Sequence, residues 1–167
     1  MRHKTKLTRA VIILGALSFL YAPGAAQTTD VLQQQIREAR EQGKPTVAQE
    51  SLQALRKSNP QAFEANNYDY LLARLQESAG NLAEAEANYQ GTVTRNSVLK
   101  EYSLWHLAQI SRSTGDLVHE RERLRLLLNL GPNSLLRQAA AVRLGQSFLE
   151  SQDFKSAAAA FRQLSGS

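Results

Sequence analysis

Four short turn segments recur along the chain at intervals of 37, 35 and 37 residues, each between two stretches with helical periodicity. The segments are Gln42-Gly43-Lys44, Ala79-Gly80-Asn81, Thr114-Gly115-Asp116 and Ser151-Gln152-Asp153. A repeat of this length predicts a solenoid of helical hairpins, because one hairpin cannot bury its apolar face alone and must stack on a neighbour. The period predicts an architecture but does not identify a ligand.

Small and large side chains keep fixed positions relative to the central residue of each turn. Seven residues before it stand Ile36, Ala73, Ala108 and Gly145, five after it Ala48, Ala85, Glu120 and Ala157, and nine after it Leu52, Tyr89, Leu124 and Phe161. Small residues where two helices approach, with a large side chain one turn further on, are typical of interdigitating hairpins. Glu120 departs from this pattern, since a small residue is expected there.

We therefore predict an all-α solenoid of four hairpins, at about residues 30–58, 62–95, 98–130 and 134–165. The eight helices are expected at 30–42, 46–58, 62–79, 82–95, 98–114, 117–130, 134–151 and 154–165. No segment shows the sustained alternation of a strand. Pro60 and Pro132 follow the second helix of their hairpins, where a helix should stop. The expected N-caps are Asp30, Asn81, Asp116, Asn133 and Asp153.

These residues resemble the tetratricopeptide repeat family, which implies a right-handed superhelix. The best matches are Leu144, Gly145, Phe148, Asp153, Phe154, Ala157 and Phe161, together with Ala73, Gly80, Asn81, Ala85 and Tyr89. The stretch 68–164, with residues 95–102 and 132–136, also looks like the N-terminal solenoid of bacterial soluble lytic murein transglycosylases and the repeats of periplasmic Tol-Pal coordinator proteins. In those transglycosylases a separate domain carries a catalytic Glu-Ser-x-Phe motif. Residues 150–154 match it only with the Phe one position late, so we assign them no catalysis.

Residues 1–26 are predicted to form a secretory signal peptide. Four basic residues precede an apolar run from Ala10 to Tyr21, and small residues follow, with cleavage expected after Ala26. The run is shorter than the roughly 20 residues that span a bilayer, although an uncleaved anchor is the alternative. We expect a periplasmic or secreted bacterial protein, residues 27–167, with no membrane span after cleavage.

Composition argues against several classes of function. Without its signal peptide the chain keeps 16 basic and 15 acidic residues, so a nucleic-acid partner is not expected. The absence of cysteine removes thiolate catalysis and thiolate metal sites. His106 and His119 lack partners at ligand spacing, and we interpret Glu84, Glu86, Glu120 and Glu122 as solvated surface charges. We predict no catalytic, metal or cofactor site, and no enzymatic activity in this chain.

One polar stripe recurs on the first helix of each hairpin, at positions ten, six and three residues before the turn. From it we predict a concave binding groove that contacts an extended protein or peptide, or a glycan such as peptidoglycan. The candidate residues are Arg37, Tyr70, Arg74, Trp105, Gln109 and Arg112. The alternative is that they are ordinary surface residues and that Trp105 packs between hairpins.

The last predicted helix has an apolar face and no capping helix after it. We expect part of this surface to remain uncovered, so that either another chain covers it, self-association included, or the sequence is the front of a longer protein. Two functions remain open. One is a non-catalytic scaffold for protein interaction in the cell envelope, and the other is the solenoid of a lytic transglycosylase whose catalytic domain lies elsewhere.

Overall fold

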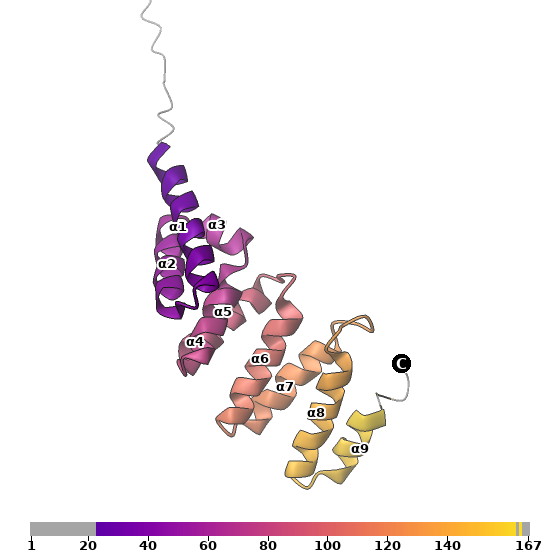
Figure 1. The fold of residues 1–167 in the computed structure, drawn as a ribbon. Helices are drawn as coiled ribbons and strands as arrows, with labels where there is room; N and C mark the ends of the chain where they lie inside the picture. The colour runs from indigo at the N-terminus through magenta and orange to yellow at the C-terminus, as the bar shows by residue number, and fades with distance from the viewer. Residues whose placement is uncertain (1–22, 163, 165–167) are drawn as a thin grey trace, which may run out of the picture.

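The computed structural model describes residues 23–162 and 164, and this part of the chain is built of helices without a strand (Figure 1). Their bounds are α1 (Pro23–Glu41), α2 (Pro45–Ser58), α3 (Pro60–Ala65), α4 (Tyr68–Ser78), α5 (Leu82–Thr94), α6 (Lys100–Ser113), α7 (Leu117–Leu128), α8 (Arg137–Glu150) and α9 (Phe154–Arg162). None of these helices is both long and apolar enough to cross a membrane.

The helices pair into the four predicted hairpins. Helix α1 packs on α2, α4 on α5, α6 on α7, and α8 on α9. Successive hairpins stack through α2 on α4, α5 on α6, and α7 on α8, so that they follow one another along the molecule (Figure 1). The fold is therefore the predicted all-α solenoid.

The hairpin turns owe their shape to one residue with positive φ in each. Gly43, Gly80 and Gly115 have φ of +63°, +80° and +80°, which glycine adopts without steric penalty. In the fourth turn Gln152 takes φ +58° instead. The same backbone conformation thus recurs in all four turns, including the one that lacks glycine.

Two of the predicted N-caps are confirmed by hydrogen bonds, and two are wrong. Asp116 Oδ1 accepts from the amide of His119, and Asp153 Oδ1 accepts from the amide of Ser156. Asn81 precedes α5 without a side-chain cap bond. Asp30 lies inside α1, which begins at Pro23 rather than near residue 30, and Asn133 lies in the loop before α8.

The predicted helix 62–79 is two helices, α3 and α4, separated by Asn66 and Asn67. Asn67 adopts φ +53°, a left-handed conformation that ends the first helix and redirects the chain. Asn59 starts α3, since its Oδ1 accepts from the amide of Ala62 at 2.9 Å and Pro60 takes the first helical position. Pro60 thus both ends α2 and begins an extra helix between the first two hairpins.

Three clusters of buried side chains form the core, and each spans a boundary between hairpins. The first joins Ile36 of α1 to Leu72 of α4, the second joins Ala73 of α4 to Leu107 of α6, and the third joins Leu104 of α6 to Ala160 of α9. Burial of apolar area between neighbouring hairpins is what holds a solenoid together.

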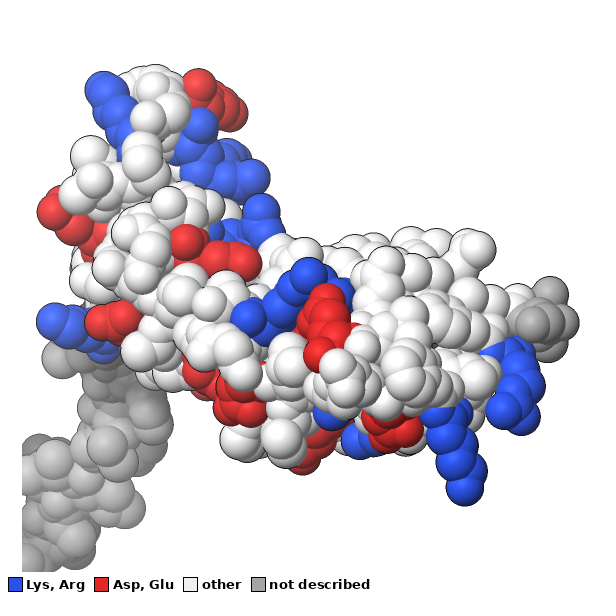
Figure 2. All heavy atoms as spheres, turned by 90° about the horizontal axis from the view of Figure 1, so that it is seen from below, with Lys and Arg blue, Asp and Glu red and all other residues white. Residues whose placement is uncertain are grey.

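The small positions lie where helices touch. Ala48, Ala85 and Ala157 are buried, and a Cβ at Gly145 would overlap the ring of Phe161. The last hairpin leaves Phe154 of α9 exposed. Charged side chains of both signs are interspersed on the face shown in Figure 2, where uncharged atoms cover most of the area.

Candidate binding groove

The predicted polar stripe lies on α1, α4, α6 and α8, and side-chain contacts join its last three helices. Arg74 of α4 contacts Nε2 of His106 on α6 at 2.7 Å, and Arg112 of α6 contacts Oε1 of Glu150 on α8 at 3.3 Å. These contacts link α4 to α6 and α6 to α8.

Three of the predicted residues meet at a cavity of about 440 Å³. Trp105, Gln109 and Arg112 line it from α6, and Arg143 lines it from α8. Ala108 and Leu124, both buried, supply an apolar wall. We call this space the Trp105 cavity.

A second cavity of about 420 Å³ lies next to it. Trp105 and Arg143 line both cavities, and Gln138, Val142 and Gln146 of α8 line the second. Trp105 is half-buried and packs against the core cluster of the last two hairpins. The indole therefore both packs between hairpins and presents a surface to the groove.

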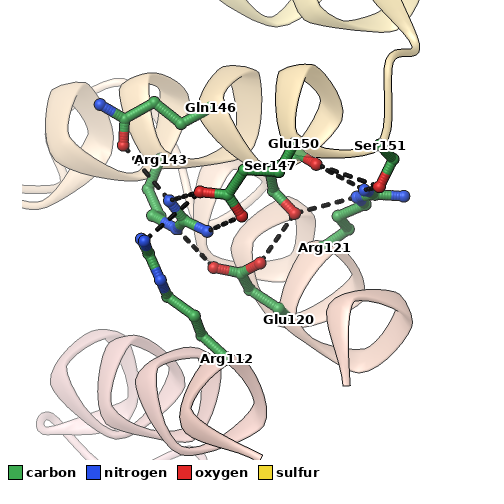
Figure 3. Close-up of polar contacts among 8 residues, drawn as sticks. All are labelled: Arg112, Glu120, Arg121, Arg143, Gln146, Ser147, Glu150 and Ser151. Carbon is green, nitrogen blue, oxygen red and sulfur yellow. Dashed lines mark hydrogen bonds and ion pairs between the residues drawn. The ribbon is translucent and has the colours of Figure 1, made fainter. Parts of the chain in front are cut away.

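A network of ion pairs and hydrogen bonds lies beside the Trp105 cavity (Figure 3), and its members Arg112, Glu120 and Arg143 line that cavity. Glu120 of α7 is only 1% exposed, and it accepts hydrogen bonds from Arg143 and from Ser147, the latter at 2.7 Å. The interpretation of Glu120 as a solvated charge is therefore wrong. Its carboxylate is buried because α8 brings a guanidinium and a hydroxyl against it, which satisfies the charge away from water.

Arg143 joins the two carboxylates of this network. It donates to both oxygens of Glu150 at 3.0 Å, while also pairing with Glu120. Burial lowers the pKa of Arg143, but its hydrogen bonds to Glu150 and Glu120 outweigh this effect and raise the pKa overall. The same hydrogen bond lowers the pKa of Glu150. Both side chains are therefore held charged.

Arg121 extends the network toward the last turn. It donates to the carbonyl of Ser147 and to the hydroxyls of Ser147 and Ser151, and its guanidinium lies 4.6 Å from the centre of the Phe148 ring. The sequence pattern singled out neither Arg143 nor Arg121. The sequence feature that could have pointed to Arg143 was Glu120, because a carboxylate at a position where small residues normally pack requires a cation from a neighbouring helix.

A second polar cluster joins α4, α5 and α6. Glu77 accepts a hydrogen bond of 2.6 Å from the hydroxyl of Tyr89 and lies 3.0 Å from Nδ1 of His106. The His106 ring stacks on Tyr89 with centroids 5.1 Å apart, and Tyr70 meets both rings edge-on. The predicted residues Tyr70 and Arg74 thus belong to one cluster, which we call the His106 cluster.

Burial sets the protonation of this cluster. Desolvation is the main cause that lowers the pKa of His106, against the opposing effect of Glu77. Desolvation and the hydrogen bond to Glu77 raise the pKa of Tyr89 far above its usual range, and burial also raises the pKa of Tyr70. A neutral His106 can donate from Nδ1 to Glu77 and accept at Nε2 from Arg74.

Arg37 lies apart from the other candidate residues. Its side chain is exposed on α1, and within the described residues it makes no hydrogen bond or ion pair. Between the first two hairpins there is a smaller cavity of about 230 Å³, lined by Arg40, Pro45 and Leu75 among others. The structure therefore places Trp105, Gln109 and Arg112 at one cavity, Tyr70 and Arg74 in the His106 cluster, and Arg37 with neither.

The groove presents polar donors, aromatic rings and apolar side chains side by side. It offers guanidinium and amide donors beside aromatic rings and an apolar wall, a combination found where proteins bind extended partners. Across the described part of the chain, no three His, Cys, Asp or Glu side chains are grouped so as to hold a metal ion.

Comparison with known proteins agrees with this architecture. Residues 34–96 match a model of the tetratricopeptide repeat family. Among solved structures, the chain is similar to a tetratricopeptide repeat protein from Parabacteroides merdae, with 21% sequence identity and a TM-score of 0.69. The match covers 81% of this chain and 52% of that one, so this chain spans about half the length of that structure. No curated protein matches.

Proposed function

We propose that this chain is a member of the tetratricopeptide repeat family, whose model residues 34–96 match, and that it is a non-catalytic scaffold that binds an extended segment of a partner protein in its groove. Repeats of this kind mediate protein–protein interaction through their concave surfaces. The observation that carries the proposal is the Trp105 cavity, where Gln109 and Arg112 stand on one helix and Arg143 on the next.

Loss of partner binding in a groove variant tests this proposal. The double variant Gln109→Ala, Arg112→Ala removes two exposed donors, while the control Lys57→Ala, Glu122→Ala removes two exposed charges that line no cavity described above. We expect the partner recovered from a cell extract by the immobilised wild-type chain to be lost with the first variant and kept with the control. Equal recovery from both variants would contradict groove binding.

We further propose that the protein is exported to the bacterial envelope. The support is the basic and apolar pattern of residues 1–22, which lie outside the described residues, together with the small residues that follow. Cleavage after Ala26 would remove the first four residues of α1. N-terminal sequencing of the protein from the periplasm or the medium should then begin at Gln27, whereas an intact N-terminus in the cytoplasm would contradict export.

Peptidoglycan and a second copy of the chain are further ligands that we propose to test in the same preparation. Co-sedimentation with murein sacculi measures the first, and analytical ultracentrifugation measures self-association through the exposed Phe154 on α9. A non-catalytic scaffold should release no anhydro-muropeptides from murein, and such release would contradict the proposal.

A further inference from the structure

Two loops between hairpins repeat one short sequence pattern that the groove does not use. Residues 96–100 after α5 read Asn-Ser-Val-Leu-Lys, and residues 133–137 after α7 read Asn-Ser-Leu-Leu-Arg. Both consist of asparagine, serine, an aliphatic residue, leucine and a basic residue, and they lie 37 residues apart. Both loops lie along the upper edge of the solenoid in Figure 1, opposite the hairpin turns.

Each pattern folds into the same turn. The carbonyl of Ser97 accepts from the amide of Lys100 at 3.0 Å, and the carbonyl of Ser134 accepts from the amide of Arg137 at 3.2 Å. In both turns the serine hydroxyl also accepts from the amide of the leucine, at 3.1 and 3.3 Å. The aliphatic residue of each pattern therefore occupies the second position of a β-turn.

These two aliphatic residues are exposed. Val98 is 83% exposed and Leu135 is 80% exposed, more than any other large apolar residue in the described part of the chain. The leucine that follows each of them is half-buried, and Leu136 packs against the core of the last two hairpins. The fold therefore uses the serine and the leucine of the pattern. It does not use the residue between them, since a polar side chain would suit the turn equally well.

A basic residue with neutral partners follows two positions after each exposed aliphatic residue. Lys100 contacts the side-chain oxygen of Asn96 at 3.2 Å, and Arg137 donates to the carbonyl of Leu128 at 2.8 Å. Neither forms an ion pair with a described residue. Both cations therefore remain available to an anion outside the chain.

The other charges near these loops do not change that arrangement. Arg95, the second basic residue of the first loop, is paired with Asp69. Glu101 follows Lys100, whereas residues 123–149, which include the second loop, contain no acidic residue. The net charge of the edge is small, so its exposed apolar side chains supply most of the attraction for a partner, and the two cations orient it.

We propose that this edge contacts a lipid surface, with Val98 and Leu135 entering the membrane interface and Lys100 and Arg137 meeting headgroup phosphates. Aliphatic groups next to cations suit such an interface, because the apolar groups enter the acyl boundary while the basic groups stay among the phosphates. The exposed residues are single side chains on separate loops, whereas a protein interface has a contiguous, closely packed core. None of them belongs to the polar stripe, so this inference is independent of the groove function.

Site-specific fluorescence tests the contact, because the chain has no cysteine and accepts a single labelled one. A polarity-sensitive dye is attached to the full chain through Val98→Cys or Leu135→Cys. The control is Val118→Cys, which replaces an exposed valine at the start of α7, beside a hairpin turn on the opposite edge. The probes are vesicles of phosphatidylcholine alone and of an equimolar mixture with phosphatidylglycerol. We expect a blue shift and a several-fold rise in emission at positions 98 and 135, and neither at position 118.

Further substitutions in the chain labelled at position 98 measure the contributions. Leu135→Ser should weaken vesicle binding about tenfold, through loss of one buried aliphatic side chain, while Val118→Ser should leave it unchanged. Lys100→Gln and Arg137→Gln should each weaken binding to the mixed vesicles about fivefold. All labelled chains keep the same N-terminus, so a difference between positions reports the edge, and unfolding curves check that each variant is folded.

Three results overturn this inference. Unchanged emission at positions 98 and 135 with both kinds of vesicle rejects the contact, and an equal change at position 118 rejects its location. A blue shift that grows with protein concentration in the absence of vesicles shows instead that a second copy of the chain covers the edge. The groove function is judged separately, by partner recovery with the Gln109 and Arg112 variant.

Discussion

Glu120 occupies the position at which the other three hairpins have alanine. A buried carboxylate is unfavourable unless a cation and hydrogen bonds meet it, and here Arg143 and Ser147 of the next hairpin provide them. The residue that departs from the repeat therefore ties the third hairpin to the fourth.

Removing this carboxylate should destabilise the fold. Glu120→Ala leaves Arg143 and Ser147 without one of their partners, while Arg143 keeps its contact with Glu150, so we expect the free energy of unfolding in urea to fall by about 1–3 kcal/mol. Glu122→Ala, at an exposed site on the same helix, should change it by less than about 0.5 kcal/mol. The double variant Glu120→Ala, Arg143→Met should recover much of the loss, and a double variant less stable than Glu120→Ala would contradict the ion-pair account.

Gly145 tests the packing of the last hairpin. A Cβ at this position would overlap the Phe161 ring, so Gly145→Ala should lower stability through overpacking, a loss of about 1–3 kcal/mol that the better helix propensity of alanine only partly offsets. Gly91→Ala is the matched control, because its Cβ would have only an ordinary contact of 3.6 Å with Asp69. We expect that variant to be stabilised, and Phe161→Leu to relieve Gly145→Ala.

For single residues, the sequence predicted which sites are small or large better than it predicted which side chains contact each other. The small and large sites of each repeat were predictable because stacking imposes the same spacing on every hairpin. The pairing of Glu120 with Arg143 was not, since it depends on how long side chains from two helices cross an interface. The same holds for the contact between Glu77 and His106.

Among the elements, the fourth hairpin turn is the one built without glycine. Gln152 holds φ +58°, a conformation that costs a side-chain-bearing residue roughly 1–2 kcal/mol. Gln152→Gly should therefore raise the midpoint of thermal unfolding, and Gly80→Gln at the equivalent turn should lower it. A fall in stability with Gln152→Gly would show that the glutamine side chain supports the turn.

The junction of α4, α5 and α6 should make stability depend on pH. The pKa of His106 lies below its ordinary value of 6.5 because of burial, so the unfolded chain takes up a proton more readily than the folded one. The free energy of unfolding should therefore fall as pH drops from 6.5 through the lowered pKa. Arg74, Glu77, Tyr70 and Tyr89 face this ring from α4 and α5.

Urea unfolding at pH 7.5 and pH 5 measures this dependence. His106→Gln should reduce the difference between the two pH values, while His119→Gln, at an exposed site, should leave it nearly as in the wild type. A pH dependence that is unaffected by His106→Gln would contradict the assignment.

The helices and turns were predictable where the repeat period and the turn residues indicated the same boundary. All four hairpins appear at the expected places, whereas the break between α3 and α4 was missed. Asn66 and Asn67 interrupt an otherwise helical pattern, and only the backbone shows that Asn67 takes the left-handed conformation that ends α3. The start of the extra helix α3 could have been predicted from Asn59 followed by Pro60, since this pair is typical of a helix N-terminus.

For the molecule as a whole, stacking converts four similar hairpins into one surface. The core clusters cross every hairpin boundary, and contacts from Arg74 to His106 and from Arg112 to Glu150 carry the polar face from α4 to α8. The position of this face was predictable from the repeat. The ion pairs within it were not, because they depend on which long side chains meet across two helices.

The central claim is that an extended segment lies along this face. Its most direct measurement is photo-crosslinking in living cells, with a photoreactive amino acid placed in turn at Arg74, Gln109 and Gln146 on the stripe, and at Lys57 and Glu122 away from it. The account predicts that one partner protein is captured from all three stripe positions, through neighbouring residues of a single segment, and from neither control position. Capture of that partner from the control positions instead of the stripe would contradict the account.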